Sequence, residues 1–164
     1  MRPLQSVARE YRVLGLGEVA VAVFFAVLAS VLDPVEAVAG IMLGTAVAGP
    51  AVYLPFLRPR ARRAIAEARP APTDEREDPQ AAVRRVAWPV AAQWVLTLAV
   101  SALARTPGLL AGIALGVGVA ALLTARQIEH WQVAHGASVL REPGARARTR
   151  GGARDAGYYV ERPG

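Results

Sequence analysis

The sequence predicts an all-α integral membrane protein with four transmembrane helices, built as two helical hairpins. Three long runs contain no charged residue, namely Ala37–Leu57, Val86–Ala104 and Thr106–Ala125, and a fourth, Val13–Leu32, contains only Glu18. About 20 apolar residues in an α-helix match a hydrocarbon core of about 30 Å. Hydrophobic residues make up 54% of the chain and the mean hydropathy is +0.30, as is typical of a membrane chain with polar extensions.

The basic residues indicate how these helices are oriented. All 19 of them are arginine, and they precede the first run, fill the segment between the second and third, and follow the fourth. Only Arg105 lies in a loop on the other side. The positive-inside rule therefore predicts a multi-pass protein of the cell (inner) membrane with both termini in the cytoplasm. Aromatic residues gather near the same interface, namely Tyr11, Tyr53, Trp88 and Trp131.

The chain divides into four segments. Residues 1–57 form the first hairpin with its basic N-terminus, and residues 86–126 form the second. Residues 58–85 are a cytoplasmic loop, basic at first and then proline-rich and acidic. Residues 127–164 begin with a helix, Gln127–Leu140, that either extends the fourth transmembrane helix or lies along the interface. They end in an Arg- and Gly-rich tail whose composition predicts disorder.

Two ten-residue segments point to an internal repeat. Ala39–Ala48 reads AGIMLGTAVA, and Ala111–Ala120 reads AGIALGVGVA. Each follows a short turn that contains proline. Two hairpins of the same orientation, related by an approximate twofold axis along the membrane normal, would account for this similarity. Chance is the alternative, because small apolar residues are common throughout the chain.

Small residues recur at every fourth position on the second and fourth predicted helices. The glycines of these stripes are Gly40 and Gly44 on the second helix, and Gly108, Gly112 and Gly116 on the fourth. A stripe without side chains lets two backbones approach closely, so that van der Waals contact holds the helices together in lipid. We expect these glycines to pack helices within the chain, with homo-oligomerisation as the alternative.

A candidate polar site combines the first and third predicted helices. Glu18 lies about five residues past the start of its apolar run, hence roughly 7 to 8 Å deep in the membrane. Gln93 on the third helix would lie at a similar depth, so we expect the two side chains to meet at the cytoplasmic mouth of the bundle. Further polar and aromatic residues of the third helix complete the site, namely Trp94, Thr97 and Ser101.

This site has two interpretations. Intramembrane acids often mark ion pathways, so Glu18 could bind a proton or a cation. Alternatively, the glutamate reaches the interface and pairs with Arg9 or Arg12, and the polar stripe only forms hydrogen bonds between helices. Substitution of Glu18 by glutamine separates these interpretations, because only the first requires an ionisable group.

No motif commits the chain to a reaction, a cofactor or a metal. Cysteine is absent, which excludes disulfides and thiolate sites. His130 and His135 lie about 140° apart around a helix, which does not suit a shared metal ion. We therefore nominate no catalytic residue, no metal ligand and no cofactor.

The distribution of polar segments favours a non-enzymatic accessory or scaffold subunit of a membrane complex, because every substantial polar segment faces the cytoplasm. The alternative is an oligomeric small transporter or channel that uses Glu18 and the polar stripe of the third helix. Expected partners are the lipid bilayer, anionic lipid headgroups at the Arg-rich loop and tail, and a membrane protein or a second copy of the chain. The net charge of +6 would suggest nucleic acid in a soluble protein, but the placement of the arginines favours headgroups instead.

Overall fold

The computed structural model describes residues 5–66, 68–70, 80, 83, 87–88, 91–93, 95, 99, 106–141 and 158–161. This part of the chain is mostly helical, which confirms the predicted helical class. Three helical stretches are long and apolar enough to cross a membrane, namely Val7–Leu32, Pro34–Ala66 and Pro107–His135. The third predicted span, Val86–Ala104, falls largely outside the described residues. The fourth span and the internal repeat therefore stay predictions.

Local capping explains where the first two helices begin and end. Helix α1 (Val7–Leu32) starts after Ser6, whose hydroxyl accepts the Arg9 N–H at 3.4 Å. Asp33 separates α1 from α2 (Pro34–Val52), and its carboxylate accepts the N–H groups of Val35 at 3.0 Å and Glu36 at 3.1 Å. A carboxylate cap followed by proline in the first turn is a favourable helix start. One residue therefore suffices to reverse the chain.

Helix α2 continues without a loop into the polar end of the molecule. A π-helical turn, η1 (Tyr53–Leu57), follows α2, and α3 (Arg58–Ala66) follows η1. Pro55 lies inside η1 and has no N–H to donate, so a regular α-helical ladder cannot form through this turn. The first residues of the predicted cytoplasmic loop thus extend the second predicted transmembrane helix.

Helix α5 (Pro107–His135) is longer than its apolar run. It ends at Gly136, which adopts a left-handed conformation with φ of 55° and lets the chain turn away. Residues 127–135 therefore extend the fourth predicted helix, the first of the two alternatives for this segment. The predicted helical end at Leu140 is wrong, because the chain leaves the helix at Gly136 and forms a strand from Ser138.

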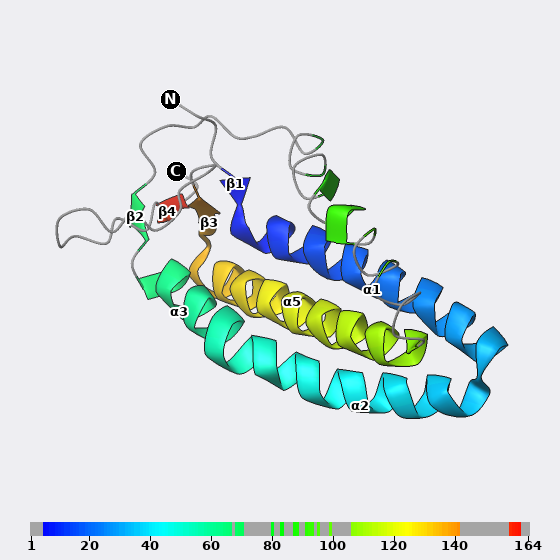
Figure 1. Cartoon of the computed structure of the whole chain (residues 1–164). Coiled ribbons are helices and arrows are strands. Elements are labelled where there is room, and N and C mark those ends of the chain that lie inside the picture. Colours follow the sequence, from blue (N-terminus) through cyan, green and yellow to red (C-terminus); the bar gives the residue numbers. More distant parts are fainter. Residues whose placement is uncertain are drawn as a thin grey trace, which may run out of the picture.

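The three long helices pack side by side, with α5 between α1 and α2 (Figure 1). Gly40 of α2 lies against Gly108, and Gly49 lies against Gly116, so α2 and α5 run in the same direction. Gly15 of α1 lies against Gly118 of α5, and α1 runs in the opposite direction. The start of α1, the end of α5 and the whole of α3 consequently share one end of the bundle.

Four short strands join at this end in one sheet. Their spatial order is β1 (Gln5–Ser6), β3 (Ser138–Arg141), β4 (Tyr158–Glu161) and β2 (Arg69–Pro70). The pairs β1–β3 and β3–β4 are antiparallel, and β2 pairs with β4 in parallel. Strand β4 lies in the tail for which disorder was expected. Its Tyr-Tyr-Val sequence suits a strand, and pairing with β3 supplies hydrogen-bond partners for its backbone.

We call the sheet, α3 and the adjoining ends of α1 and α5 the cap. The cap has its own apolar core, formed by Val7, Ala8, Ala61, Ala64, Ile128 and Val139, with Tyr11, Trp131 and Tyr158 packed against it. Two ion pairs tie its parts together. Arg141 of β3 contacts both carboxylate oxygens of Glu10 at 2.7 Å, and Arg12 of α1 contacts Glu129 of α5. The polar end of the chain is therefore a folded unit rather than a set of loose extensions.

At the opposite end, Glu36 caps α5. Thr106 precedes α5 without a side-chain cap, and the N–H of Gly108 donates instead to Oε2 of Glu36 at 3.2 Å. A carboxylate near the first turn also interacts favourably with the helix dipole. Glu36 thus connects the start of α2 to the start of α5.

Replacement of Glu36 by alanine is expected to lower the free energy of unfolding by about 1 kcal/mol, because α5 loses its cap. The Glu36→Gln variant keeps an acceptor and should lose only the charge contribution, about 0.3–1 kcal/mol. Unfolding in detergent, followed by circular dichroism, measures both values. An alanine variant as stable as the parent would show that water replaces the carboxylate at no cost.

Candidate functional site

Glu18 lies in the interface between α1 and α5 and is only 1% exposed. Glycines make this burial feasible. A Cβ added to Gly118 would lie 3.1 Å from the Cβ of Glu18 and 3.0 Å from the carbonyl oxygen of Gly15. The backbones of α1 and α5 therefore meet closely here. The glutamate side chain is buried in the structure and does not reach the polar surface.

The two carboxyl oxygens of Glu18 have different surroundings. The side chain forms a hydrogen bond with Gln93, so the structure brings together the two residues that the sequence pairs. Oε2 is buried and has no hydrogen-bond partner within the described part of the chain. Buried polar atoms usually have partners, so an unpaired carboxyl oxygen in an apolar interface is unusual.

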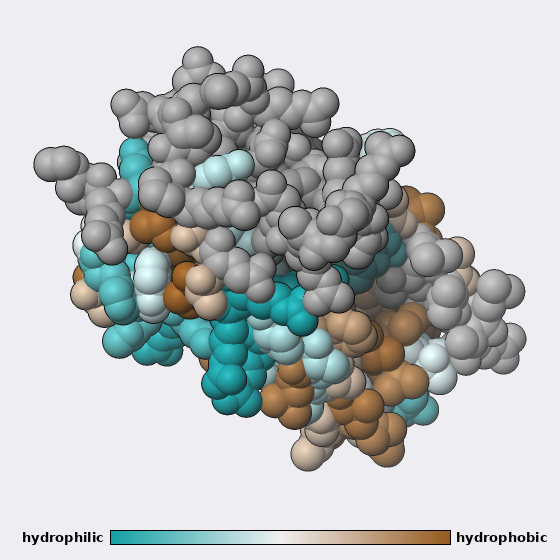
Figure 2. All heavy atoms as spheres, turned by 90° about the vertical axis from the view of Figure 1, so that its left-hand side faces the viewer, coloured by the Kyte–Doolittle hydropathy of each residue, from teal (hydrophilic) through white to brown (hydrophobic). Residues whose placement is uncertain are grey.

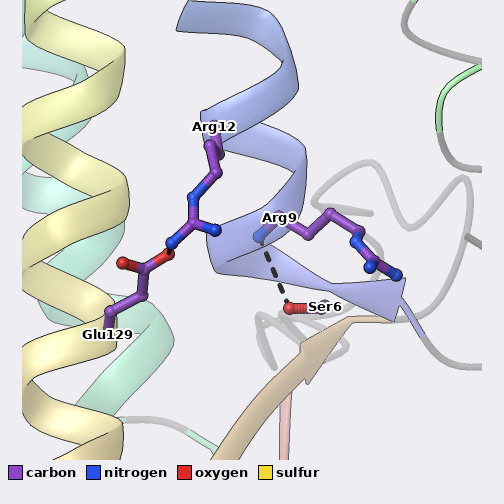
Figure 3. Close-up of polar contacts among 4 residues, drawn as sticks. All are labelled: Ser6, Arg9, Arg12 and Glu129. Carbon is purple, nitrogen blue, oxygen red and sulfur yellow. Dashed lines mark hydrogen bonds and ion pairs between the residues drawn. The ribbon is translucent and has the colours of Figure 1, made fainter.

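The arginines near Glu18 in the sequence are directed elsewhere. The guanidinium of Arg12 points toward α5 and pairs with Glu129, whereas the side chain of Arg9 extends away from both residues (Figure 3). The alternative in which Glu18 reaches the interface to pair with Arg9 or Arg12 thus differs from the structure. Arg12 already has a carboxylate partner on α5, and Glu18 is enclosed.

The remaining members of the predicted polar site, Trp94, Thr97 and Ser101, lie outside the described residues. The arrangement of the site can therefore be given only for Glu18 and Gln93. Among the described residues, no group of three or more His, Cys, Asp or Glu side chains could hold a metal ion. What these two residues offer is one carboxyl group with one neutral amide partner, which can accept, hold or release a proton.

The five glycines predicted to pack helices all lie in the contact between α2 and α5. A Cβ added to Gly40 would lie 2.4 Å from the N atom of Leu109, and one added to Gly44 would lie 2.6 Å from its carbonyl oxygen. A Cβ added to any of the three glycines of α5 would likewise lie 2.8 Å or less from a backbone atom of α2; these glycines are Gly108, Gly112 and Gly116. Thr45 also donates to the carbonyl oxygen of Gly112 at 3.2 Å. The two stripes face each other, and each helix fits where the other lacks side chains.

Sequence reasoning did not identify the contact of α5 with α1. Gly15 and Gly118 mark it, but neither belongs to a four-residue repeat, so no stripe signals their role. Glu36 was also missed as a cap, although its position two residues after the proline of a turn places it in a first helical turn.

No protein-family model matches this chain, and no curated protein or solved structure is significantly similar to it. The function has to be inferred from the charges, contacts and burial of this chain alone.

The described arginines gather at one end of the structure. Arginines lie at the cap end, namely Arg9, Arg12, Arg58, Arg60, Arg62, Arg63, Arg126 and Arg141. Near the opposite end, the described charged residues are Asp33 and Glu36. Figure 2 looks onto the cap end and shows hydrophilic residues gathered there, with hydrophobic residues at one side.

Proposed function

We propose that the protein spans the membrane four times, with the cap in the cytoplasm. Connectivity supports the fourth span. Strand β2 ends at Pro70 in the cap, whereas α5 begins at Pro107 near Glu36, at the far end of the bundle. The residues between them must therefore connect the two ends, and the apolar run Val86–Ala104 has the length of a span. The arginines of the cap support the orientation.

We propose further that the protein is a non-enzymatic accessory or scaffold subunit of a membrane complex. The folded cap is the observation that carries this proposal. Segments from residue 5 to residue 161 meet in one sheet over an apolar core, so the described parts of the loop and the tail belong to one defined surface. A surface of fixed shape suits the recognition of another protein, because little conformational entropy is lost when it binds.

The chemistry of the cap indicates what it would bind. Arg62 and Arg63 of α3 are exposed, and neither forms an ion pair or a side-chain hydrogen bond with any described residue. Unpaired arginine side chains suit carboxylates, which they can contact through two parallel hydrogen bonds. The expected partner is a membrane protein with an acidic cytoplasmic segment.

The test is native mass spectrometry of the complex, extracted from its own membrane in a mild detergent. We expect a second protein at fixed stoichiometry, lost or strongly reduced when Arg62 and Arg63 are both replaced by glutamate. The Glu18→Gln variant is the matched control and should keep the partner, because Glu18 lies outside the cap. A chain that is recovered only with copies of itself would contradict the accessory role.

One observation favours a second candidate, an oligomeric transporter that uses Glu18. Oε2 of this residue is buried without a partner within the described part of the chain, so a proton bound there would displace no existing hydrogen bond. The Glu18→Gln variant should then abolish the movement of protons into proteoliposomes that contain the protein. Glu36→Gln, at the opposite end of the bundle, is the control and should leave the flux unchanged. Flux that survives Glu18→Gln would exclude this candidate.

A further inference from the structure

An open cavity lies on the side of the bundle where α2, η1 and α5 meet. Its volume is about 370 Å³, within the range of small-molecule pockets, which is about 300–1,000 Å³. The residues that shape it are Gly49, Pro50, Tyr53, Gly116, Val119 and Leu123. Gly49 and Gly116 lie against each other and form the floor of the cavity, while larger side chains such as Tyr53 and Leu123 line it. We call this cavity the α2–α5 groove.

The lining of the α2–α5 groove favours hydrocarbon. Its hydroxyl groups already have partners, because Thr45 donates to the carbonyl oxygen of Gly112 at 3.2 Å and Tyr53 donates to Oε1 of Gln127 at 3.5 Å. The other lining groups are aliphatic or glycine backbone within helices. Such a surface can offer van der Waals contact but few hydrogen bonds. The matching occupant is a flexible apolar chain.

Among the described residues, positive charge lies at one end of the groove. Arg58 directly follows η1, and Arg126 lies three residues after Leu123 on α5, which places it on the same side of the helix. Both arginines are exposed, and neither has an ion-pair or hydrogen-bond partner among the described residues. Their guanidinium groups suit a phosphate, which arginine recognises through parallel hydrogen bonds.

We propose that the α2–α5 groove binds an acyl chain of one anionic phospholipid of the cytoplasmic leaflet, while Arg58 and Arg126 contact its phosphate, whose negative charge no headgroup ammonium compensates. The inference rests on the proposed membrane location with the cap in the cytoplasm, but not on the accessory role. The proposal is based on the sequence of chemical groups along the surface. An apolar groove, whose hydroxyl groups already have partners, is followed one turn later by two arginines without partners among the described residues. A phospholipid has the same sequence of groups, with an apolar acyl chain followed by an anionic headgroup.

The experiment measures lipid retained by the full chain. The protein is purified in detergent, stripped of lipid, and titrated with phosphatidylglycerol or phosphatidylethanolamine carrying identical acyl chains, with bound lipid counted by native mass spectrometry. We expect one phosphatidylglycerol to bind more tightly than phosphatidylethanolamine. Replacing Arg58 and Arg126 by glutamine should weaken the binding of phosphatidylglycerol about fivefold for each arginine and remove the preference for this lipid over phosphatidylethanolamine. The Arg62→Gln/Arg63→Gln double variant is the charge control and should keep this preference.

A second pair of variants tests the groove itself. Val119→Trp fills the groove and should abolish retention of the phospholipid. Val27→Trp places the same side chain on an exposed position of α1, at 62% exposure, and should retain it. Equal binding of the two phospholipids, or retention by Val119→Trp, would overturn the proposal. If Val119→Trp instead disrupts a dimer of a chain that retains no lipid, the groove receives a second copy and the lipid site is refuted.

These outcomes are separate from those of the proposed function. Lipid binding with no protein partner in the native complex would refute the accessory role and leave the lipid site intact. A protein partner that is lost when Arg62 and Arg63 are substituted would support the accessory role. If the same chain bound phosphatidylglycerol no more tightly than phosphatidylethanolamine, the lipid site would be refuted.

Discussion

Replacement of Gly112 by alanine is expected to destabilise the protein by about 1–3 kcal/mol. The added Cβ would lie 2.5 Å from the carbonyl oxygen of Ile41 and 2.7 Å from that of Gly40. Both atoms belong to the backbone of α2, so no side chain can move aside and the helices must separate. The intrinsic helix propensity of alanine, about 1 kcal/mol better than that of glycine, does not offset this loss of contact. Unfolding in detergent, followed by circular dichroism, measures the change.

Gly49→Ala is the matched control in the same interface. The nearest atom to its added Cβ is the carbonyl oxygen of Gly116 at 3.4 Å, an ordinary van der Waals distance. This variant should be as stable as the parent or more stable by up to about 1 kcal/mol. Equal destabilisation by the two substitutions would mean that α2 and α5 do not pack in this register.

Replacement of Glu18 by lysine is expected to cost about 3 kcal/mol or more. The side chain is 1% exposed, and the other acidic residues of α1 and α5, Glu10 and Glu129, already pair with Arg141 and Arg12. A lysine ammonium would therefore be buried without a carboxylate partner among the described residues, beside the Gln93 amide. The fraction of chain recovered in the membrane and its unfolding in detergent measure the loss.

Glu18→Gln keeps the shape of the side chain and its capacity for a hydrogen bond with Gln93. Its stability should stay within about 1 kcal/mol of the parent, since a neutral hydrogen bond contributes about that much. A lysine variant as stable as the glutamine variant would mean that residue 18 reaches water.

The long helices are predictable from the sequence because their signals are local. Apolar runs of sufficient length, the Asp33-Pro34 start of α2 and the glycine stripes of α2 and α5 each act within a few turns. Gly136 could also have marked the end of α5, since glycine favours the left-handed conformation that ends a helix. The contact of Gly15 with Gly118 could not be predicted, because it involves one glycine from each helix and these two glycines belong to no periodic pattern.

The cap could not be predicted for a different reason. Its strands are two to four residues long, too short for an alternating pattern, and each pairs with a segment distant in the sequence. Gln5 pairs with Arg141, and Pro70 pairs with Val160. Composition predicts disorder for the tail that contains β4 and a helix for most of β3, whereas tertiary contacts with the apolar core of the cap determine the actual structure. The sequence predicts part of the candidate site: it pairs Glu18 with Gln93, but it does not reveal that the carboxyl group is almost fully buried.

The order of strands in the cap has a consequence for biosynthesis. Strand β4 is made last, yet it lies between β3 and β2 and is the partner of β2 in the sheet. The helices can enter the membrane while the chain is still on the ribosome, but the sheet cannot close until Glu161 has left the exit tunnel. A nascent or prematurely terminated chain would therefore carry an incomplete cap, and quality-control proteases could distinguish it from the finished protein.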